Sequence, residues 1–309
     1  MIQHLLDTNG YAAVLLLVEH AIGRAGALVA LLAALLVGLI LAGGWVVRNA
    51  AAIRGWVSRL IRRVGASPFI RGLRERHPKA WSFVARRFAA GEYLGLHLSV
   101  GLLLSLGALW LFGGISEDVV HHDPITQVDL TIANTFHRHA TPTGVAIAKG
   151  VSFLGSPGFI AAWGLGLVVV LLVRRRPLMA GGWIAAVAGG GVLDLALKRV
   201  FRRTRPTWDV PLLTARGWSF PSGHAMGSLI AYGMLAYLLV RDAKGRRPRT
   251  AIVVGAVLLV LLIGLSRMYL GVHYLSDVLG GYAAGVVWLA ACITGLEVAR
   301  RIPQGTPSS

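Results

Sequence analysis

The sequence predicts an all-α fold, a polytopic membrane helix bundle with a six-span core and one extra span at the N-terminus. Of the 309 residues, 55% are hydrophobic and 14% are charged, and the mean hydropathy is +0.66. A soluble domain carries about a quarter charged residues. Several apolar runs approach the roughly 20 residues that a helix needs to cross a bilayer. The short alternating segments of a membrane β-barrel do not occur.

Seven apolar runs are the candidate spans, in chain order 25–47, 94–115, 157–173, 178–197, 224–240, 250–265 and 276–298. The run 11–18 is too short to cross alone and is interpreted as a re-entrant or interfacial piece. Residues 1–10 contain no Lys or Arg, which is not typical of a cleavable signal peptide. The predicted parts are an N-terminal helix with a basic linker (1–93), a six-span core (94–298) and a cytoplasmic tail (299–309).

The basic residues indicate the side of the membrane on which each loop lies. If the spans cross alternately, loops 48–93, 174–177, 241–249 and 299–309 hold 21 Lys and Arg residues, and the opposite set holds 10. Cytoplasmic loops carry the excess of Lys and Arg. The first set is therefore predicted to be cytoplasmic.

The outer segment 198–223 departs from this bias. It carries six cationic residues, namely Lys198, Arg199, Arg202, Arg203, Arg205 and Arg216. The positive charge of this segment must therefore have a role other than setting the orientation of the protein in the membrane.

The linker 48–93 has apolar residues at helical spacing with arginines between them. The apolar positions are Ile53, Trp56, Val57, Leu60, Ile61 and Val64. This pattern is typical of an amphipathic helix on the anionic inner leaflet. A solvated basic linker and a protein docking site are the alternatives.

The net charge of +18 does not indicate nucleic-acid binding. The cations are confined to a few loops between spans, and they form neither a basic face nor a known binding motif. The single cysteine, Cys292, excludes an internal disulfide and a Cys-based zinc site.

Three polar stretches lie at the outward ends of predicted spans. They are KRVFRRTRP (198–206), PSGH (221–224) and SRMYLGVHYLSD (266–277). Because these ends share one face of the membrane, the three stretches are expected to meet.

The residue types in these stretches suit a phosphoryl group. Lys198, Arg205 and Arg267 would concentrate positive charge, and guanidinium groups match phosphate oxygens bidentately. Ser222 and Gly223 lie where a helix is predicted to begin, and free backbone N–H groups at a helix N-terminus favour an anion.

Two histidines complete the set. His273 and Asp277 are spaced i, i+4, so on a helix the carboxylate could orient the imidazole for nucleophilic attack. His224 could act as general acid. Taken singly, a histidine near a span end is more often interfacial, and Arg267 could extend to the headgroups. Their joint placement on one side favours a site.

Three further residues lie close to these stretches. Asp194 is one turn before Lys198 inside a span, where a carboxylate is usually paired, either with Lys198 or with a neighbouring span. Trp208 and Trp218 flank the outer loop and are expected at headgroup level or against substrate.

In this order, K-x6-RP, PSGH and SR-x5-H-x3-D resemble the signature of the type 2 phosphatidic acid phosphatase superfamily. That group contains membrane lipid phosphate phosphatases, soluble bacterial acid phosphatases and vanadium haloperoxidases. The signature spans 198–277, and the six-span pattern fits the membrane members. Every position is filled, by Lys198, Arg205, Pro206, Pro221, Ser222, Gly223, His224, Ser266, Arg267, His273 and Asp277.

The resemblance implies covalent catalysis without metal or cofactor. His273 would form a phosphohistidine, oriented by Asp277, and His224 would protonate the leaving group and then activate water. The phosphate oxygens would be held by Lys198, Arg205, Ser222, Gly223 and Arg267. Residues 1–93 look similar to a remnant of the extra membrane domain that some bacterial members carry ahead of the phosphatase.

We therefore expect a hydrolase of a lipid phosphate or pyrophosphate, at the outer (periplasmic) face of a bacterial inner (plasma) membrane. The expected partners are the bilayer and a lipid such as undecaprenyl pyrophosphate, phosphatidic acid, phosphatidylglycerol phosphate or lipid A phosphate. One alternative is a lipid-to-lipid phosphotransferase that uses the same site. Another is a lipid-binding or transport protein without catalysis.

Overall fold

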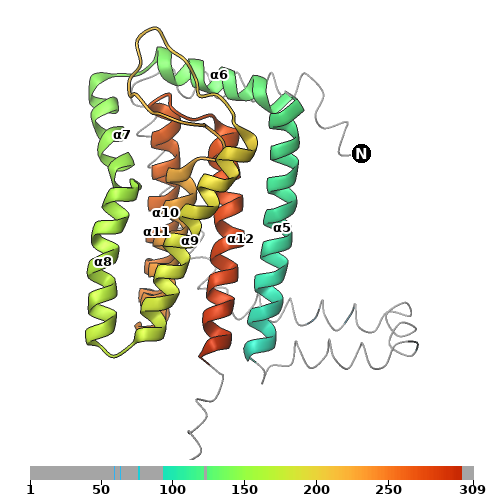
Figure 1. The fold of residues 1–309 in the computed structure, drawn as a ribbon, viewed down its shortest axis with the longest axis vertical. Coiled ribbons are helices and arrows are strands. Elements are labelled where there is room, and N and C mark those ends of the chain that lie inside the picture. Colours follow the sequence, from blue (N-terminus) through green and yellow to red (C-terminus); the bar gives the residue numbers. More distant parts are fainter. Residues whose placement is uncertain (1–58, 60–62, 64–75, 77–92, 122–123, 301–309) are drawn as a thin grey trace, which may run out of the picture.

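The structure is a computed structural model, which describes residues 93–121 and 124–300, and single residues 59, 63 and 76. The predicted first span, the piece at 11–18, the amphipathic linker and nearly all of the tail lie outside the described residues. The described part contains eight helices and no strands (Figure 1), which confirms the all-α fold. The helices are α5 (Tyr93–His121), α6 (Pro124–Arg138), α7 (Pro142–Leu154), α8 (Pro157–Val173), α9 (Pro177–Phe201), α10 (Gly223–Asp242), α11 (Arg246–Tyr269) and α12 (Leu275–Ala299).

Six spans make up the described bundle. Five helices are long and apolar enough to cross a bilayer alone, namely α5 from Gly101 onward, α9, α10, α11 and α12. The sixth span consists of α7 and α8, which meet at a bend of 42°. The described part thus has five candidate spans, or six when the bent pair counts as one, and the protein is a multi-pass membrane protein.

The third predicted span differs from its expected bounds. Residues 116–156 were expected to form an outer loop before a span at 157–173, but they contain α6 and α7, so this span begins at Pro142. The break follows from Gly155-Ser156-Pro157. Proline lacks the N–H that would continue α7, and Ser156 starts the next helix by accepting a hydrogen bond from the Phe159 N–H.

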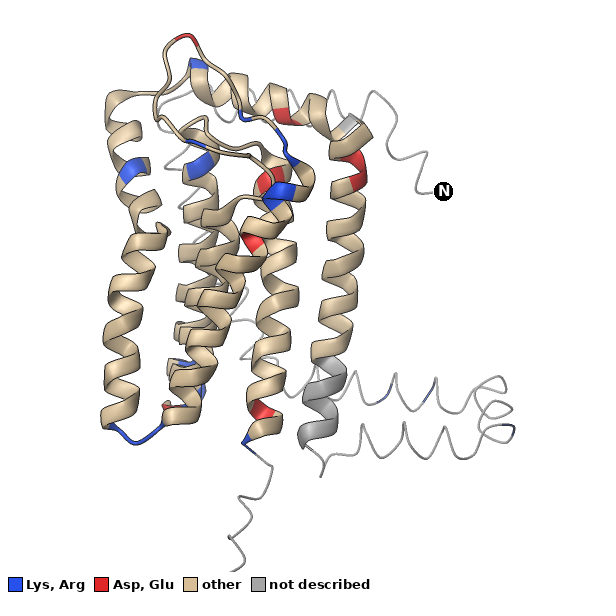
Figure 2. Ribbon diagram, viewed as in Figure 1, with Lys and Arg blue, Asp and Glu red and all other residues tan. Residues whose placement is uncertain are grey.

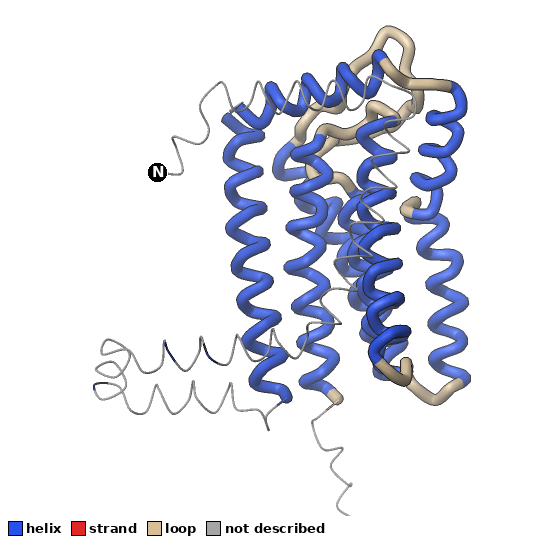
Figure 3. Tube along the Cα trace, turned by 180° about the vertical axis from the view of Figure 1, so that it is seen from behind, coloured by secondary structure: helices blue, strands red, loops and turns tan. Residues whose placement is uncertain are grey.

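The connections separate two ends of the bundle. Helix α6 lies across one end, where the loop 202–222 and the turn 270–274 also lie, and the α8–α9 connection lies at the opposite end (Figure 1). Figure 2 shows the arginines of that opposite connection, Arg174 to Arg176, at the foot of the bundle. Viewed from behind, the spans run roughly parallel and the long loop covers one end only (Figure 3). All three polar stretches therefore share one end.

The core packs α8, α9, α10 and α12 together through residues such as Trp183, Met226, Ile230 and Met234. Where α12 meets the start of α10, the helices approach so closely that a Cβ on Gly281 would lie 2.7 Å from the Ser222 carbonyl oxygen. The Ser222 N–H donates to the Asp277 carbonyl at 2.9 Å. This contact places the PSGH stretch beside the beginning of α12.

Candidate active site

A cavity of about 340 Å³ opens at the end of the bundle that carries α6. Its polar lining consists of Asp194, Lys198, Arg205, Arg216, His224, Arg267 and His273. Its apolar lining continues between α8, α9 and α10 through Pro157, Ile160, Val187 and Ile230. The cavity thus joins a cationic mouth to an apolar interior that runs into the membrane-spanning part.

His273 lies in the turn between α11 and α12, not on a helix as the i, i+4 spacing suggested. Helix α12 begins at Leu275, and Tyr274 is its N-cap residue. The turn needs Gly271, whose φ of +68° favours glycine and whose added Cβ would lie 2.7 Å from Trp208 Nε1. Trp208 donates to the Gly271 carbonyl at 2.8 Å and stacks on His137 of α6. Trp208 therefore holds the turn in place.

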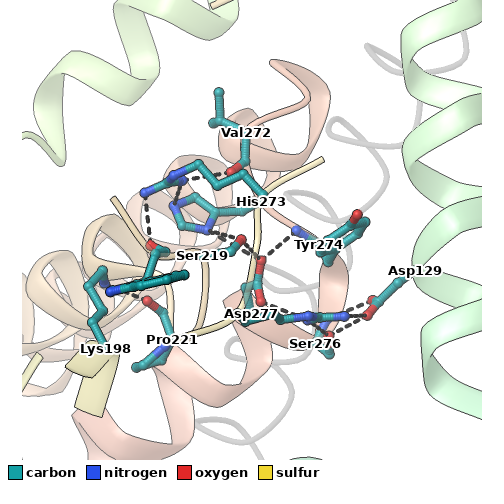
Figure 4. Close-up of polar contacts among 12 residues, drawn as sticks. Asp129, Lys198, Ser219, Pro221, Val272, His273, Tyr274, Ser276 and Asp277 are labelled. Atoms are coloured by element: carbon teal, nitrogen blue, oxygen red, sulfur yellow. Dashed lines mark hydrogen bonds and ion pairs between the residues drawn. The ribbon is translucent and has the colours of Figure 1, made fainter. Parts of the chain in front are cut away.

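The tautomer of His273 follows from its contacts with Arg205 and Asp277. Arg205 Nη1 lies 3.0 Å from His273 Nε2. A guanidinium can only donate, so Nε2 accepts and Nδ1 carries the proton. Nδ1 lies 3.4 Å from Asp277 Oδ2 and 3.4 Å from Ser219 Oγ, and Ser219 in turn donates to Asp277. Figure 4 shows Ser219 and Asp277 together on one side of the His273 ring, the side of Nδ1.

Burial sets the charge state of His273. The side chain is 3% exposed, and burial lowers the pKa of His273 to about 4, although the hydrogen bond and charge of Asp277 act in the opposite direction. The positive charges of Arg205 and Arg267 add to the lowering. The imidazole is therefore neutral at pH 7.

Arg205 is fixed by backbone oxygens. Its guanidinium donates to the carbonyls of Val272 at 2.7 Å, Gly217 at 3.0 Å, Trp218 at 3.1 Å and Arg216 at 3.3 Å. This single side chain ties the loop before α10 to the turn that carries His273.

Lys198 also has fixed partners. Its Nζ lies 2.5 Å from Asp194 Oδ1 and 2.6 Å from the Pro221 carbonyl oxygen. The predicted Asp194–Lys198 pair is present, one helical turn apart on α9. Asp194 also abuts the start of α10, where a Cβ on Gly223 would lie 2.8 Å from Asp194 Oδ2.

Two polar atoms at the site have no partner within the part of the protein that is described. Ser222 is the N-cap of α10, yet its buried Oγ makes no hydrogen bond. Arg267 donates from Nη1 to Ser152 at 2.6 Å, whereas its buried Nε is unpaired. Buried polar atoms are normally satisfied; of these two residues, Arg267 lines the cavity, and Ser222 immediately precedes Gly223, which also lines it.

His224 begins the first turn of α10 and lines the same cavity as His273. The break between α7 and α8 approaches it, since a Cβ on Gly155 would lie 3.6 Å from His224 Cδ2. All eight predicted site residues therefore gather at one end of the bundle. Within the described ranges, no group of three or more His, Cys, Asp or Glu residues is arranged to hold a metal.

Sequence reasoning missed Ser219, Arg203 and Asp129. Arg203 forms ion pairs with Asp277 at 2.7 Å and with Asp129 of α6 at 2.8 Å. Burial alone would lower the pKa of Arg203, but the two carboxylates outweigh it and hold the pKa above its usual value. The number of cations in 198–223 could have indicated a further partner such as Arg203, because the predicted site uses only two of the six.

Comparisons with known proteins agree with this geometry. Residues 180–301 match the family model of the PAP2 superfamily. Phosphatidylglycerophosphatase B of Bacillus subtilis strain 168 is 30% identical over 186 residues, which cover 58% of this chain and 89% of that protein. A decaprenylphosphoryl-5-phosphoribose phosphatase of Mycobacterium tuberculosis is 35% identical over 154 residues, covering 47% of this chain and 76% of that protein.

The fold has a solved counterpart. The crystal structure of a transmembrane PAP2 type phosphatidylglycerolphosphate phosphatase from Bacillus subtilis superposes with a TM-score of 0.57 at 24% identity, over 67% of this chain and 98% of that one. The resemblance inferred from the three motifs is confirmed, as is the enzyme class of membrane phosphatase. The chain belongs to the PAP2 superfamily.

Proposed function

We propose that this protein hydrolyses a phosphate monoester or pyrophosphate of a membrane lipid at the outer face of the membrane, through a phosphohistidine on His273. The observation that carries the proposal is the composition of the cavity. Its mouth combines an unprotonated imidazole nitrogen with four cationic side chains, and its interior is apolar and lies between membrane-spanning helices. A lipid phosphate has the same division into anionic head and apolar chain.

The first step breaks the phosphorus–oxygen bond of the lipid. The Nε2 lone pair of His273 attacks phosphorus, while Asp277 stabilises the proton on Nδ1. His224, which takes up a proton when the anionic phosphate binds beside it, gives that proton to the departing lipid oxygen. The charge that builds on the phosphate oxygens is met by Lys198, Arg205, Ser222, Gly223 and Arg267, which stabilise the transition state more than the ground state.

The second step releases phosphate. His224, now neutral, accepts a proton from water, the water oxygen attacks phosphorus, and the phosphorus–nitrogen bond breaks. His273 returns to its starting form, so the cycle consumes one water. Cationic side chains take the part that a metal would take in other phosphatases, and we therefore expect metal independence.

The names of the relatives support a lipid substrate without choosing one. Phosphatidylglycerophosphatase B and decaprenylphosphoryl-5-phosphoribose phosphatase act, by name, on phosphates attached to different lipids. Candidate substrates are phosphatidylglycerol phosphate, phosphatidic acid, undecaprenyl pyrophosphate, a polyprenylphosphoryl sugar phosphate and the phosphates of lipid A.

The first prediction concerns the reaction itself. Purified wild type should release inorganic phosphate from at least one of these lipids in detergent, without added metal and in the presence of EDTA. His273→Ala should lose essentially all release, because the nucleophile is gone. With a ³²P-labelled substrate, acid-labile label should appear on wild type and be absent from His273→Ala. Label that moves to another lipid, and not to water, would identify a phosphotransferase. Strong inhibition by EDTA that a divalent cation reverses would contradict metal independence.

The second prediction concerns the pH dependence. Because burial lowers the pKa of His273 to about 4, its imidazole in the ligand-free protein should titrate well below the ordinary value of 6.5. NMR of histidine-labelled protein can follow this signal, assigned by its absence in His273→Ala. Between pH 6.5 and 4 the folded state binds fewer protons at this site than the unfolded state, so this site makes stability decline as pH falls through that window. A midpoint near 6.5 would contradict the argument from burial.

The third prediction concerns the membrane face. Arg216 is exposed at the mouth of the cavity, and Lys244 is exposed at the opposite end of the bundle. In a Cys292→Ala background, Arg216→Cys should react with a membrane-impermeant thiol reagent in intact cells. Lys244→Cys is the control and should react only after permeabilisation. The reverse pattern would place the site on the cytoplasmic side.

The fourth prediction concerns entry of the lipid chain between helices. Gly191 of α9 lines the cavity, and a Cβ there would meet nothing within 4 Å. Gly191→Leu should fill this space and raise KM for a long-chain substrate about tenfold, equivalent to about 1.4 kcal/mol. The KM for a short-chain, water-soluble analogue should stay unchanged.

Gly181→Leu is the matched control, because Gly181 lies on the same helix, has equal room and does not line the cavity. Leucine is a better helix former than glycine at both positions. Equal effects of the two substitutions on KM would contradict entry along this path.

A further inference from the structure

Asp129 is a buried carboxylate that belongs to none of the three motifs. It comes from α6, the helix across the end of the bundle, and is 1% exposed. An ionised carboxylate without water is costly unless it is paired and hydrogen-bonded. Asp129 Oδ1 accepts from the Ser276 N–H at 2.9 Å, and Oδ2 accepts from the Ser276 hydroxyl and from Arg203 Nη2 at 2.8 Å.

Arg203 joins this carboxylate to a second one. Its Nη1 donates to Asp277 Oδ1 at 2.7 Å and to Ser276 Oγ at 2.6 Å, and its guanidinium lies over the Tyr274 ring, 4.4 Å from the centroid. Figure 4 shows the two carboxylates that it joins, Asp277 and Asp129, on either side of Ser276 at the start of α12. The side chain is 13% exposed. Together, the hydrogen bonds to Asp129, Asp277 and Ser276 and the contact with the Tyr274 ring fix the plane of the Arg203 guanidinium.

The contact with Asp277 determines how that carboxylate faces His273. Arg203 holds Oδ1, whereas Oδ2 accepts from the Tyr274 N–H at 2.8 Å and from Ser219 and lies beside His273 Nδ1. A carboxylate has two equivalent oxygens, so fixing Oδ1 fixes the rotation that brings Oδ2 toward the imidazole.

We propose that Arg203 and Asp129 are positioning residues of the phosphatase reaction. Asp129 fixes the guanidinium of Arg203, and Arg203 fixes the carboxylate of Asp277 that orients His273. The inference rests on the proposed role of His273 as nucleophile. It also gives α6 a part in catalysis, although α6 contributes no residue to the lining of the cavity.

The test measures kcat, KM and the competitive inhibition constant of inorganic phosphate, with full-length protein and the best lipid of the panel above. Arg203→Gln should lower kcat about 100-fold, since small misplacements of catalytic groups have effects of this size. KM and the inhibition constant should stay within about threefold, because the phosphate-binding side chains are untouched. Arg203→Lys should recover part of kcat, as an ammonium keeps the charge but lacks the planar fork.

Asp129→Asn tests the contact between Asp129 and Arg203. It should lower kcat about tenfold in the wild-type background and cause no further loss in the Arg203→Gln background, because Asp129 acts through Arg203. If Arg203→Gln does not fold, Asp129→Asn and Arg203→Lys carry the test.

Arg241→Gln is the matched control for stability. Arg241 pairs with the buried Glu297 at 3.5 Å, near the end of α10 opposite the cavity. The same Arg-to-Gln substitution there removes a buried ion pair far from the proposed site. It should lower the thermal midpoint and leave kcat within about twofold. If Arg203→Gln or Asp129→Asn folds and keeps kcat within about threefold of wild type, the positioning role is wrong. A loss confined to KM would also overturn it. Failure of the proposed function would look different, since wild type itself would then release no phosphate.

Discussion

The buried carboxylate of Asp277 is the interaction on which the rest of the site depends. It is fully buried and receives hydrogen bonds from Arg203, Ser219 and the Tyr274 N–H. Arg203 and Ser219 lie near the two ends of the loop between α9 and α10, and Tyr274 is the N-cap residue of α12 itself. An ionised group is tolerated at such depth only when every lone pair has a partner. The cost of burying Asp277 therefore brings both ends of the α9–α10 loop to the start of α12, beside His273.

The bilayer explains why this assembly sits at the end of the bundle. Charged groups at the centre of a membrane are expensive, whereas the ends of spans lie near the headgroups and water. Helix N-termini and loop carbonyls are also free there, and Arg205 uses four such carbonyls. The same location suits a substrate whose phosphate stays in the interface while its chain remains in the hydrocarbon.

The sequence predicted the helical membrane bundle and most of the polar residues that line the cavity. Long apolar runs have few alternatives in a membrane, and the cations, histidines and Ser-Gly pair lie at recognisable spacings. The position of His273 was wrong because i, i+4 spacing fits a capped turn as well as a helix. Asp277 is the N3 residue of α12 and accepts from the N-cap N–H, so His273 is the residue immediately before the N-cap. Gly271 was the available signal of that turn.

The remaining partners could not be found because their contacts are tertiary. Asp129 and Ser276 are 147 positions apart, and Ser219 and Asp277 are 58 apart. No local pattern marks such pairs. Helix α7 was missed for a different reason, since Lys149 and two glycines interrupt its hydropathy, although Thr141-Pro142 is a typical helix start.

The hydrogen bond between Arg205 and His273 implies that the proposed nucleophile is blocked in the ligand-free protein. One lone pair on Nε2 cannot accept from a guanidinium and bond to phosphorus at once, so the guanidinium must first exchange this partner. A phosphate oxygen offers a stronger, charge-assisted acceptor than a neutral imidazole. A molecule without such oxygens cannot draw the guanidinium of Arg205 away from Nε2, so it finds the nitrogen still hydrogen-bonded and unreactive. Recognition of the anion and exposure of the reactive nitrogen are then a single event.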